Sequence, residues 1–164
     1  MKLDLAYRFE ATLTEVVPIG LVPEGIRLDA FFKGSITDGP LSGATLRGID
    51  YLLLWADGVG VINVYEVIST SDGQYISVHA RGYSAPPAGM QLPASEVLLS
   101  PGFQWPDVPV PLHGFALART GAREFEWLNR TALAFEDSAN AGTGQLLITA
   151  HALVSETHSA QVTG

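Results

Sequence analysis

The stretch that decides the fold is GVINVYEVISTSDGQYISVHARGYS, residues 60–84. Two runs rich in β-branched and aromatic side chains flank Ser71-Asp72-Gly73. Such runs favour extended strands, and an Asp-Gly pair between them is a strong signal for the tight turn of a β-hairpin. We therefore expect an antiparallel pair of strands here.

Two registers are open for this hairpin, and they differ in which side chains meet. If residues 71–73 form a type I turn with a glycine bulge, Tyr65 faces His79 across the two strands. If residues 72–73 form a two-residue loop instead, Glu66 faces His79. We favour the first register, because it also groups Tyr65, Tyr75 and Tyr83 with the polar residues. The remaining face is then a uniform apolar wall. That wall would consist of Ile62, Val64, Ile68, Ile76, Val78 and Ala80.

Short strands and turns continue along the rest of the chain. From Leu3 to Leu13 apolar residues alternate with polar ones, which is the signature of a half-buried strand. Seventeen glycines and ten prolines divide the 164 residues into short pieces, and we find no convincing amphipathic helix among them. Seven or eight strands spaced in this way indicate an antiparallel sandwich or barrel. A closed barrel would also remove the unpaired edges that a sheet rich in Val and Ile otherwise exposes.

The length of the chain is typical of one domain, and we expect a single β-barrel domain over residues 1–156. Residues 85–112 are rich in proline and irregular, which predicts a long loop that is functional, mobile or folded over an opening. Strands near 127–136 and 144–155 would complete the domain. The polar residues 157–164 would form a flexible C-terminal tail.

The composition excludes several classes of function. The formal net charge is −8 and the nine basic residues are scattered, so we expect no nucleic-acid partner and no membrane surface. The absence of cysteine removes disulfides, thiolate metal sites and cysteine nucleophiles. The four histidines lack a metal-binding spacing, and no nucleotide-binding or serine-hydrolase motif is present. The N-terminus alternates instead of forming the apolar core of a signal peptide, so we expect a cytoplasmic protein without metal or cofactor.

Tyr65 and His79 are the first candidates for chemistry. In the favoured register they meet across the hairpin, and the near-neutral pKa of an ordinary histidine suits proton transfer. We therefore name both as candidate catalytic residues of a pocket. The alternative is an ordinary cross-strand pair on the outward face of a sheet, where tyrosine and histidine are common.

Asp50 is the third candidate catalytic residue. A carboxylate among apolar walls has its pKa raised by the loss of hydration, which suits a general base. Arg27 could pair with Asp50 and Asp57 at the border of the same cavity, and it is a candidate substrate-binding residue. Asp57-Gly58 and Asp72-Gly73 are more simply explained as turns. A turn role explains Asp50 less completely.

Trp127 and Asn129 stand at the start of the strand expected near 127–136, within TGAREFEWLNRTALAF, residues 120–135. Trp127 could supply a flat wall for a planar ligand, and Asn129 an amide that both donates and accepts hydrogen bonds. We name both as candidate substrate-binding residues. The alternative is that Trp127 fills the core and Asn129 satisfies the backbone at the end of a strand.

Six blocks, taken in order, resemble one known family. They are PEGIR, DGPLSG, RGIDY, ADGV, SDGQYISVHARG and TGAREFEWLNRT. Their order and spacing are similar to those of domain-of-unknown-function family 3237, small bacterial and fungal proteins of about this length, and the resemblance covers roughly residues 3–153. It implies an up-and-down β-barrel similar to allene oxide cyclase and dirigent proteins, and it implies homo-oligomers. It implies no particular chemistry.

The chain departs from the family pattern in two places. Where the family has a Gly-Gly-x-Asp-Trp block, this chain has Arg47-Gly48-Ile49-Asp50-Tyr51, and where an arginine is usual before the hairpin it has Tyr65. If the family arginine binds an acidic ligand, this chain would take a more neutral, aromatic one. Tyr51 thereby joins the candidate substrate-binding residues. The resemblance also places Arg27, Asp50, Asp57, Asp72, Gly73, Trp127, Leu128 and Asn129 on family motif positions.

These observations lead to one functional hypothesis and two alternatives. The first is a cofactor-independent enzyme that binds a mostly apolar, cyclic or polyketide-like molecule in a barrel and performs isomerase, cyclase or dehydratase chemistry by proton transfer. The second is a non-catalytic, lipocalin-like binding barrel, with Phe103 and Trp105 of residues 85–112 in its lid. The third is a structural module that buries apolar surface in an oligomer.

Overall fold

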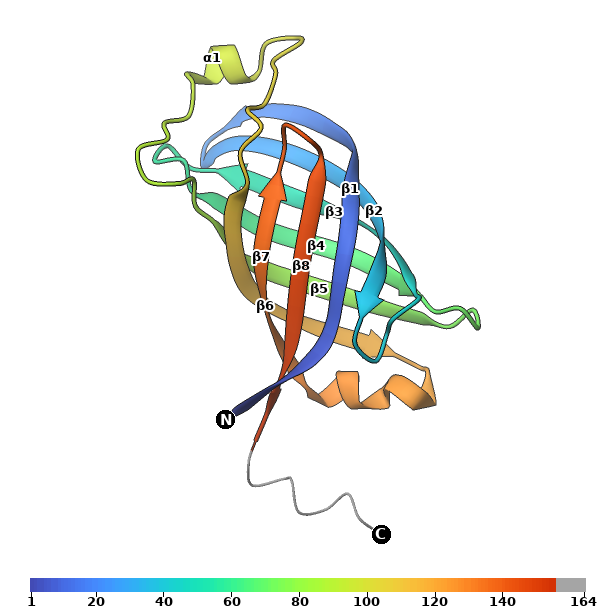
Figure 1. Cartoon of the computed structure of the whole chain (residues 1–164). Coiled ribbons are helices and arrows are strands. Elements are labelled where there is room, and N and C mark those ends of the chain that lie inside the picture. Colours follow the sequence, from blue (N-terminus) through green and yellow to red (C-terminus); the bar gives the residue numbers. More distant parts are fainter. Residues whose placement is uncertain (156–164) are drawn as a thin grey trace.

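The computed structural model describes residues 1–155 and shows a closed barrel of eight antiparallel strands (Figure 1). The strands follow one another round the barrel, and β1 pairs with both β2 and β8, which closes it. The barrel is thus confirmed, and the sandwich is excluded. The tail expected at residues 157–164 lies outside the described residues. The strands are β1 (Lys2–Val22), β2 (Gly25–Asp38), β3 (Thr45–Leu54), β4 (Gly60–Ser69), β5 (Tyr75–Ser84), β6 (Val110–Thr120), β7 (Ala132–Asn140) and β8 (Gln145–Val154).

The hairpin of β4 and β5 has the first of the two registers. Tyr65 lies opposite His79, and the Thr70 amide donates to the Gln74 carbonyl at 2.9 Å. Gly73 has a φ of 83°, a conformation that residues with a side chain rarely adopt, which explains the glycine at this position. The apolar wall predicted from the even-numbered positions faces the barrel interior, where Ile68 and Ile76 are fully buried.

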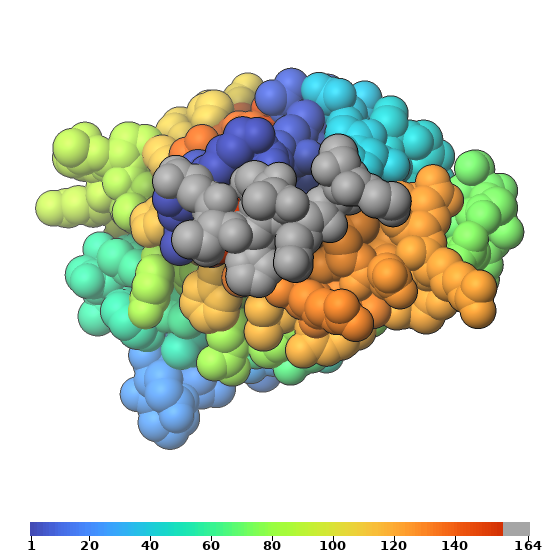
Figure 2. All heavy atoms as spheres, turned by 90° about the horizontal axis from the view of Figure 1, so that it is seen from below, coloured from blue at the N-terminus to red at the C-terminus, as the bar shows by residue number. Residues whose placement is uncertain are grey.

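Short helices lie at the two ends of the barrel (Figure 1). The 3₁₀ helix η1 (Arg123–Arg130) crosses one end, and Figure 2 views the molecule from that side. The α1 helix (Ser95–Leu98) belongs to the segment between β5 and β6 at the other end. No helix within residues 1–155 has the length and apolar character needed to cross a membrane.

Buried apolar side chains form two clusters. The larger cluster contains the stacked rings of Tyr7, Phe9 and Phe32, whose successive centroids are 6.3 and 6.5 Å apart. The smaller cluster joins Leu98 of α1 to Leu28, Ile26 and Leu54. The helix of the long segment is therefore anchored on the barrel by apolar packing.

Two predicted boundaries are wrong. The loop expected over residues 85–112 ends earlier, because β6 begins at Val110, and its prolines hide the strand in the sequence. The strand expected from residue 127 begins only at Ala132, because residues 123–130 form η1. Phe125 and Leu128 are three residues apart, so they lie on one side of the 3₁₀ turns and are buried against the barrel.

Candidate functional site

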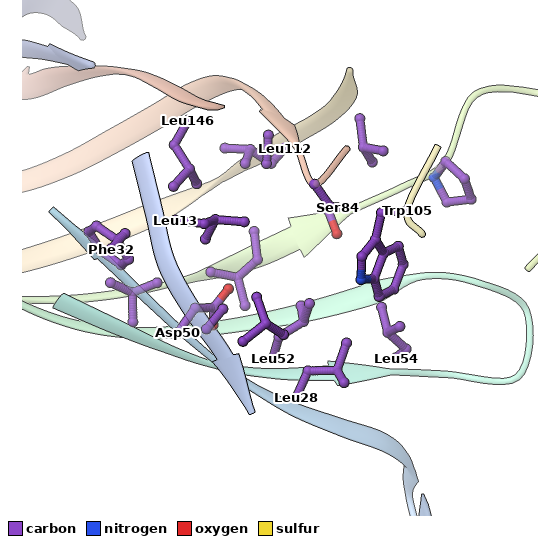
Figure 3. Close-up of a pocket in the computed structure, with 18 of the residues that line it drawn as sticks. Leu13, Leu28, Phe32, Asp50, Leu52, Leu54, Ser84, Trp105, Leu112 and Leu146 are labelled. Atoms are coloured by element: carbon purple, nitrogen blue, oxygen red, sulfur yellow. The ribbon is translucent and has the colours of Figure 1, made fainter. Parts of the chain in front are cut away.

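A cavity of about 300 Å³ lies inside the barrel and is lined by members of both buried clusters. This volume is at the lower end of the range for small-molecule sites, roughly 300–1,000 Å³. Figure 3 shows leucine side chains from several strands around it, with Asp50 among them. A guest in this cavity would therefore contact mainly hydrocarbon. The apolar lining includes Leu13, Leu28, Phe32, Leu52, Leu54, Leu112 and Leu146.

The segment between β5 and β6 covers the cavity at the α1 end. Leu92, Phe103 and Trp105 line the cavity, and the rings of Phe103 and Trp105 meet edge to face at 5.3 Å. The Asn140 side chain donates to Asp107 Oδ1 at 2.7 Å, which ties the segment to the end of β7. The residues expected in a lid thus lie over the interior.

Asp50 is the one predicted site residue that lines this cavity. It is half-buried, and the surface that remains accessible faces the cavity. The Asn63 amide donates to Asp50 Oδ1 at 2.9 Å, and this amide is free to do so because the β3–β4 pairing is interrupted between Asp50 and Leu53. Burial raises the pKa of Asp50 to about 6, although the Asn63 amide and the positive charge of Arg27 act against the rise. The carboxyl group can therefore gain and lose a proton near neutral pH.

Glu66 is a second buried carboxyl group in the same cavity, with only 5% of its surface exposed. Burial raises its pKa to about 7, and a hydrogen bond from the Tyr7 side chain acts in the opposite direction. The pKa of Tyr7 is raised well above its ordinary value by burial and by the neighbouring Glu66. Tyr7 therefore keeps its proton and donates it in a hydrogen bond to the Glu66 carboxylate.

The charge character of the cavity limits its ligands. Among the described residues, the titratable side chains that line it are Tyr7, Asp50 and Glu66, and no lysine, arginine or histidine lines it. An anion would meet carboxyl groups without a compensating cation. The lining suits a neutral molecule with one or two polar atoms.

Four predicted site residues lie together on the outer wall of the barrel and not in the cavity. The ring of Tyr65 stacks on His79 with centroids 4.1 Å apart, and Tyr51 meets Tyr65 edge-on at 6.1 Å. The guanidinium group of Arg27 lies 4.8 Å from the centre of the Tyr51 ring. They point outward because their odd-numbered positions alternate with the inward even-numbered ones. The expected grouping of Tyr65 and His79 with Asp50 in one pocket is wrong.

Arg27 also has a different partner from the one expected. Its Nε atom donates to Asp29 Oδ1 at 2.6 Å, whereas Asp50 faces the interior. Asp57 accepts a hydrogen bond from the Val59 amide at 3.0 Å, which is ordinary turn chemistry. The predicted ion pair of Arg27 with Asp50 and Asp57 is therefore wrong, and the turn explanation of Asp57 is confirmed. Asp72 likewise bonds within its own turn, to Thr70 and Gln74.

Trp127 and Asn129 lie in η1 and do not line the cavity. The Thr120 amide donates to Asn129 Oδ1 and Asn129 Nδ2 donates to the Thr120 carbonyl, both at 2.9 Å. The side-chain amide thus satisfies the backbone at the end of β6. Trp127 packs against the larger buried cluster. Their expected place in the hollow is wrong, because η1 turns this segment across the end of the barrel.

Sequence reasoning missed Tyr7 and Glu66 as site residues, although the sequence holds a signal for both. Glu66 occupies an even-numbered position between Val64 and Ile68, so the favoured register already places it on the apolar face. A single carboxyl group in a wall of hydrocarbon needs a partner or a function. Tyr7 belongs to the apolar side of the N-terminal alternation.

Within residues 1–155, no three or more histidine or acidic side chains are arranged to hold a metal ion. The site is thus built from two carboxyl groups and one phenol in an apolar cavity.

The family model described as "Protein of unknown function (DUF3237)" matches residues 1–136, which is most of the chain.

The chain belongs to the DUF3237 family. No curated protein matches it in sequence. Several solved structures share its fold at low identity. A β-barrel-like protein from Acinetobacter baumannii AYE is 21% identical with a TM-score of 0.70, and the match covers 93% of this chain and 96% of that one.

Two further neighbours span a similar share of the chain. A conserved protein of unknown function from Rhodopseudomonas palustris is 15% identical with a TM-score of 0.73, covering 93% of this chain and 97% of that one. An enzyme from Penicillium herquei is 18% identical with a TM-score of 0.59, covering 93% of this chain and 96% of that one. At these identities the likeness concerns the fold.

Proposed function

We propose that this DUF3237 protein is a cofactor-independent enzyme that binds a neutral, mostly apolar, cyclic or polyketide-like molecule inside the barrel and transfers a proton to or from it. The observation that carries the proposal is the Asp50 carboxyl group, which lines an otherwise largely apolar cavity. Its raised pKa, about 6, makes it a stronger base than an ordinary aspartate. An enzyme from Penicillium herquei has a similar fold, which is compatible with catalysis in such a barrel.

The proposed chemistry begins with a substrate whose carbonyl group enters the cavity and whose acidic C–H bond faces Asp50. The ionised carboxylate takes the proton, and the electron pair of the broken C–H bond stays on the substrate, which becomes an enolate. Leucine side chains hold the rest of the molecule in one conformation, which lowers the barrier by fixing the geometry of the reacting atoms. Isomerisation, cyclisation and dehydration can all start from this step.

Hydrogen exchange into a model ketone tests the proposal. The probe is 2-tetralone, a neutral bicyclic ketone, incubated with the protein in D₂O and followed by mass spectrometry. We expect the wild-type protein to accelerate exchange next to the carbonyl, and Asp50→Asn to lose this acceleration by about 100-fold, because the amide accepts no proton. Asp57→Asn, an exposed turn residue, is the matched control and should exchange as the wild type.

Trp105 supplies an independent signal for binding, because its indole ring lines the cavity. We expect 2-tetralone to change the tryptophan fluorescence of the wild-type protein and to leave that of Trp105→Phe unchanged. If the wild type and Asp50→Asn exchanged 2-tetralone at the same rate, the proposal that the protein is an enzyme with Asp50 as its base would be wrong. A fluorescence change without any exchange would favour the binding barrel instead.

We also propose that the outer wall associates with a second copy of the chain. Tyr65, Tyr83 and Phe115 are each about half exposed on this wall, at 48%, 46% and 56%. The groove beside them carries both charge signs, with Arg27 and Arg81 opposed by acidic side chains. A face that carries both signs can complement itself in a two-fold dimer.

A further inference from the structure

We propose that Glu66, together with Tyr7, is a second proton-transfer group of this cavity, so that Asp50 and Glu66 act on two positions of one bound carbonyl compound. The inference rests on the proposed function and specifies its substrate as an unsaturated ketone or a related conjugated carbonyl compound. The geometry that carries it is the placement of both carboxyl groups on one inner wall.

The register of β3 and β4 fixes that placement. Asp50 pairs with Val64, and Gly48 pairs with Glu66, so the two carboxyl-bearing residues are diagonal neighbours on the same face. Diagonal neighbours in an antiparallel pair are about 7–8 Å apart. Asp50 and Glu66 both line the cavity. One guest molecule can therefore contact both groups at atoms separated by a few bonds.

Gly48 contributes to this arrangement through the absence of a side chain. A Cβ atom at this position would come within 2.6 Å of the Phe32 ring and 2.8 Å of the Glu66 Cβ atom. The missing side chain allows Phe32 to lie against the wall beside Glu66. Phe32 and Glu66 thus both lie against Gly48, and the Glu66 side chain is hydrogen-bonded by Tyr7.

The surroundings of Glu66 favour a role in function over a role in stability. It has no cation as a partner among the residues that line the cavity, and its hydrogen bond comes from the neutral Tyr7. No fully buried side-chain oxygen or nitrogen in the described part of the chain lacks a hydrogen-bond partner. Any Glu66 oxygen that Tyr7 leaves free is therefore accessible, and the space it meets is the cavity. An apolar residue would be less costly to bury there.

The proposed step is a double-bond migration in which all atoms stay on the substrate. The Asp50 carboxylate takes a proton from the carbon between the carbonyl group and the double bond, and the C–H electron pair forms a dienolate. The Glu66 carboxylic acid gives its proton to the far carbon of the former double bond. The double bond then lies next to the carbonyl group, Asp50 is protonated and Glu66 is ionised. Proton exchange through water returns both groups to their starting states.

The protonation states support this division of roles. The step needs Asp50 ionised and Glu66 protonated, and burial raises the pKa values of these groups to about 6 and about 7. The titratable groups that face Glu66 are Tyr7 on β1 and Asp50 on β3, among the described residues that line the cavity. Tyr7 stays protonated across this range because its own pKa is raised further.

The test uses cyclohex-3-enone, a ketone whose double bond becomes conjugated when it migrates, so that ultraviolet absorbance reports the reaction. We expect the wild-type protein to accelerate the migration and Glu66→Gln to lose about 100-fold of that acceleration, because the amide gives no proton. The same variant should lose far less of the 2-tetralone exchange, because Asp50 takes the proton in that reaction. Glu10→Gln, an exposed glutamate on β1, is the matched control and should resemble the wild type.

A pH profile separates proton transfer from a structural role. The wild-type rate should fall as pH rises through the pKa of Glu66, and Glu66→Gln should lack this fall. Tyr7→Phe removes a hydrogen bond that lowers the pKa of Glu66, so its rate should begin to fall at a higher pH.

The outcomes distinguish the two proposals. Migration at the same rate in the wild type and Glu66→Gln, with exchange still dependent on Asp50, would overturn the role of Glu66 alone. Absence of exchange in the wild type would overturn the proposed function and this inference with it. Retained exchange with lost migration in Glu66→Gln supports both.

Discussion

The backbone amide of Asn63 donates to Asp50 Oδ1 at 2.9 Å, at the place where the pairing of β3 with β4 is interrupted. A backbone amide that would otherwise form a hydrogen bond within the sheet thus donates to a carboxylate inside the barrel. A charge-assisted hydrogen bond of this kind favours the ionised form and offsets part of the cost of burial. The side chain of Asn63 meanwhile bonds to His79 Nε2 at 2.9 Å on the outer wall. One residue therefore connects the two faces of the sheet at the candidate base.

The stability of the protein should depend on pH through Glu66. Its pKa is raised from 4.5 to about 7, so the folded state binds more protons than the unfolded state between these values. The contribution of Glu66 is present at low pH and is lost as pH rises through this window. At about 1.4 kcal/mol per pKa unit, the loss is roughly 3 kcal/mol. Urea unfolding should therefore show a larger fall in stability for the wild type than for Glu66→Gln between about pH 4.5 and 7.5, and an equal fall would contradict the assignment.

Substitutions of Tyr65 and His79 should leave the chemistry of the cavity intact. Both side chains lie on the outer wall, stacked on each other at 4.1 Å. We expect Tyr65→Phe and His79→Ala to exchange 2-tetralone within about threefold of the wild-type rate, since the general acid–base effects of roughly 100-fold belong to groups that reach the substrate. Exchange rates in D₂O measure this directly. If either variant lost as much exchange activity as Asp50→Asn, the two residues would have to be regarded as catalytic.

Asn129→Ala should destabilise the barrel without affecting the cavity. The side chain makes two hydrogen bonds to the backbone of Thr120, and its removal leaves that amide and carbonyl without their partner. We expect a loss of about 2 kcal/mol in the free energy of unfolding, measured with urea. Binding of 2-tetralone, followed by the fluorescence of Trp105, should stay unchanged. Weaker binding in the folded variant would show that η1 contributes to the site.

The outer wall should control the oligomeric state. Phe115 and Leu117 are 56% and 47% exposed on adjacent outward positions of β6. Phe115→Arg and Leu117→Glu should therefore shift the protein toward the monomer in size-exclusion chromatography with light scattering, because a charge would be desolvated in the contact. Lys33→Glu, an exposed position on β2, is the control. A monomeric wild type would refute the proposed association.

Asp137 should be replaceable by glycine with a gain in stability. It pairs with Leu112 and Ile148, both of which line the cavity, yet Asp137 itself is exposed and has a φ of 145°. Such a conformation costs a residue with a side chain about 1–3 kcal/mol. Asp137→Gly should raise the thermal midpoint, and Asp137→Val should lower it, because a branched side chain tolerates this backbone least. A lower midpoint for the glycine variant would show that the bonds of Asp137 to Ser138 and Thr149 outweigh the strain.

The fold was predictable because the alternation of apolar and polar residues can be seen within each short strand, and each strand of the barrel turns alternate residues inward and outward. The predicted apolar wall at even-numbered positions of the β4–β5 hairpin exists and points into the barrel, and Asp50 on β3 shares that interior. The same alternation should have placed Tyr65 and His79 outside, since one strand cannot direct neighbouring positions to the same face. The segment around Trp127 could not be assigned in this way. A 3₁₀ helix of eight residues is held by its contacts with the barrel end, and these become visible only when distant strands are assembled.

The pairing of β1 with β8 places Lys2 opposite Val154, and these two residues are separated by almost the whole length of the described chain. During synthesis the first strand must wait with one unpaired edge until the last strand has left the ribosome. Contacts so distant in sequence slow folding, since a long loop has to close before they form. A chaperone that shields the edge of β1 would therefore be expected to raise the yield of this protein more than that of a helical protein of equal size.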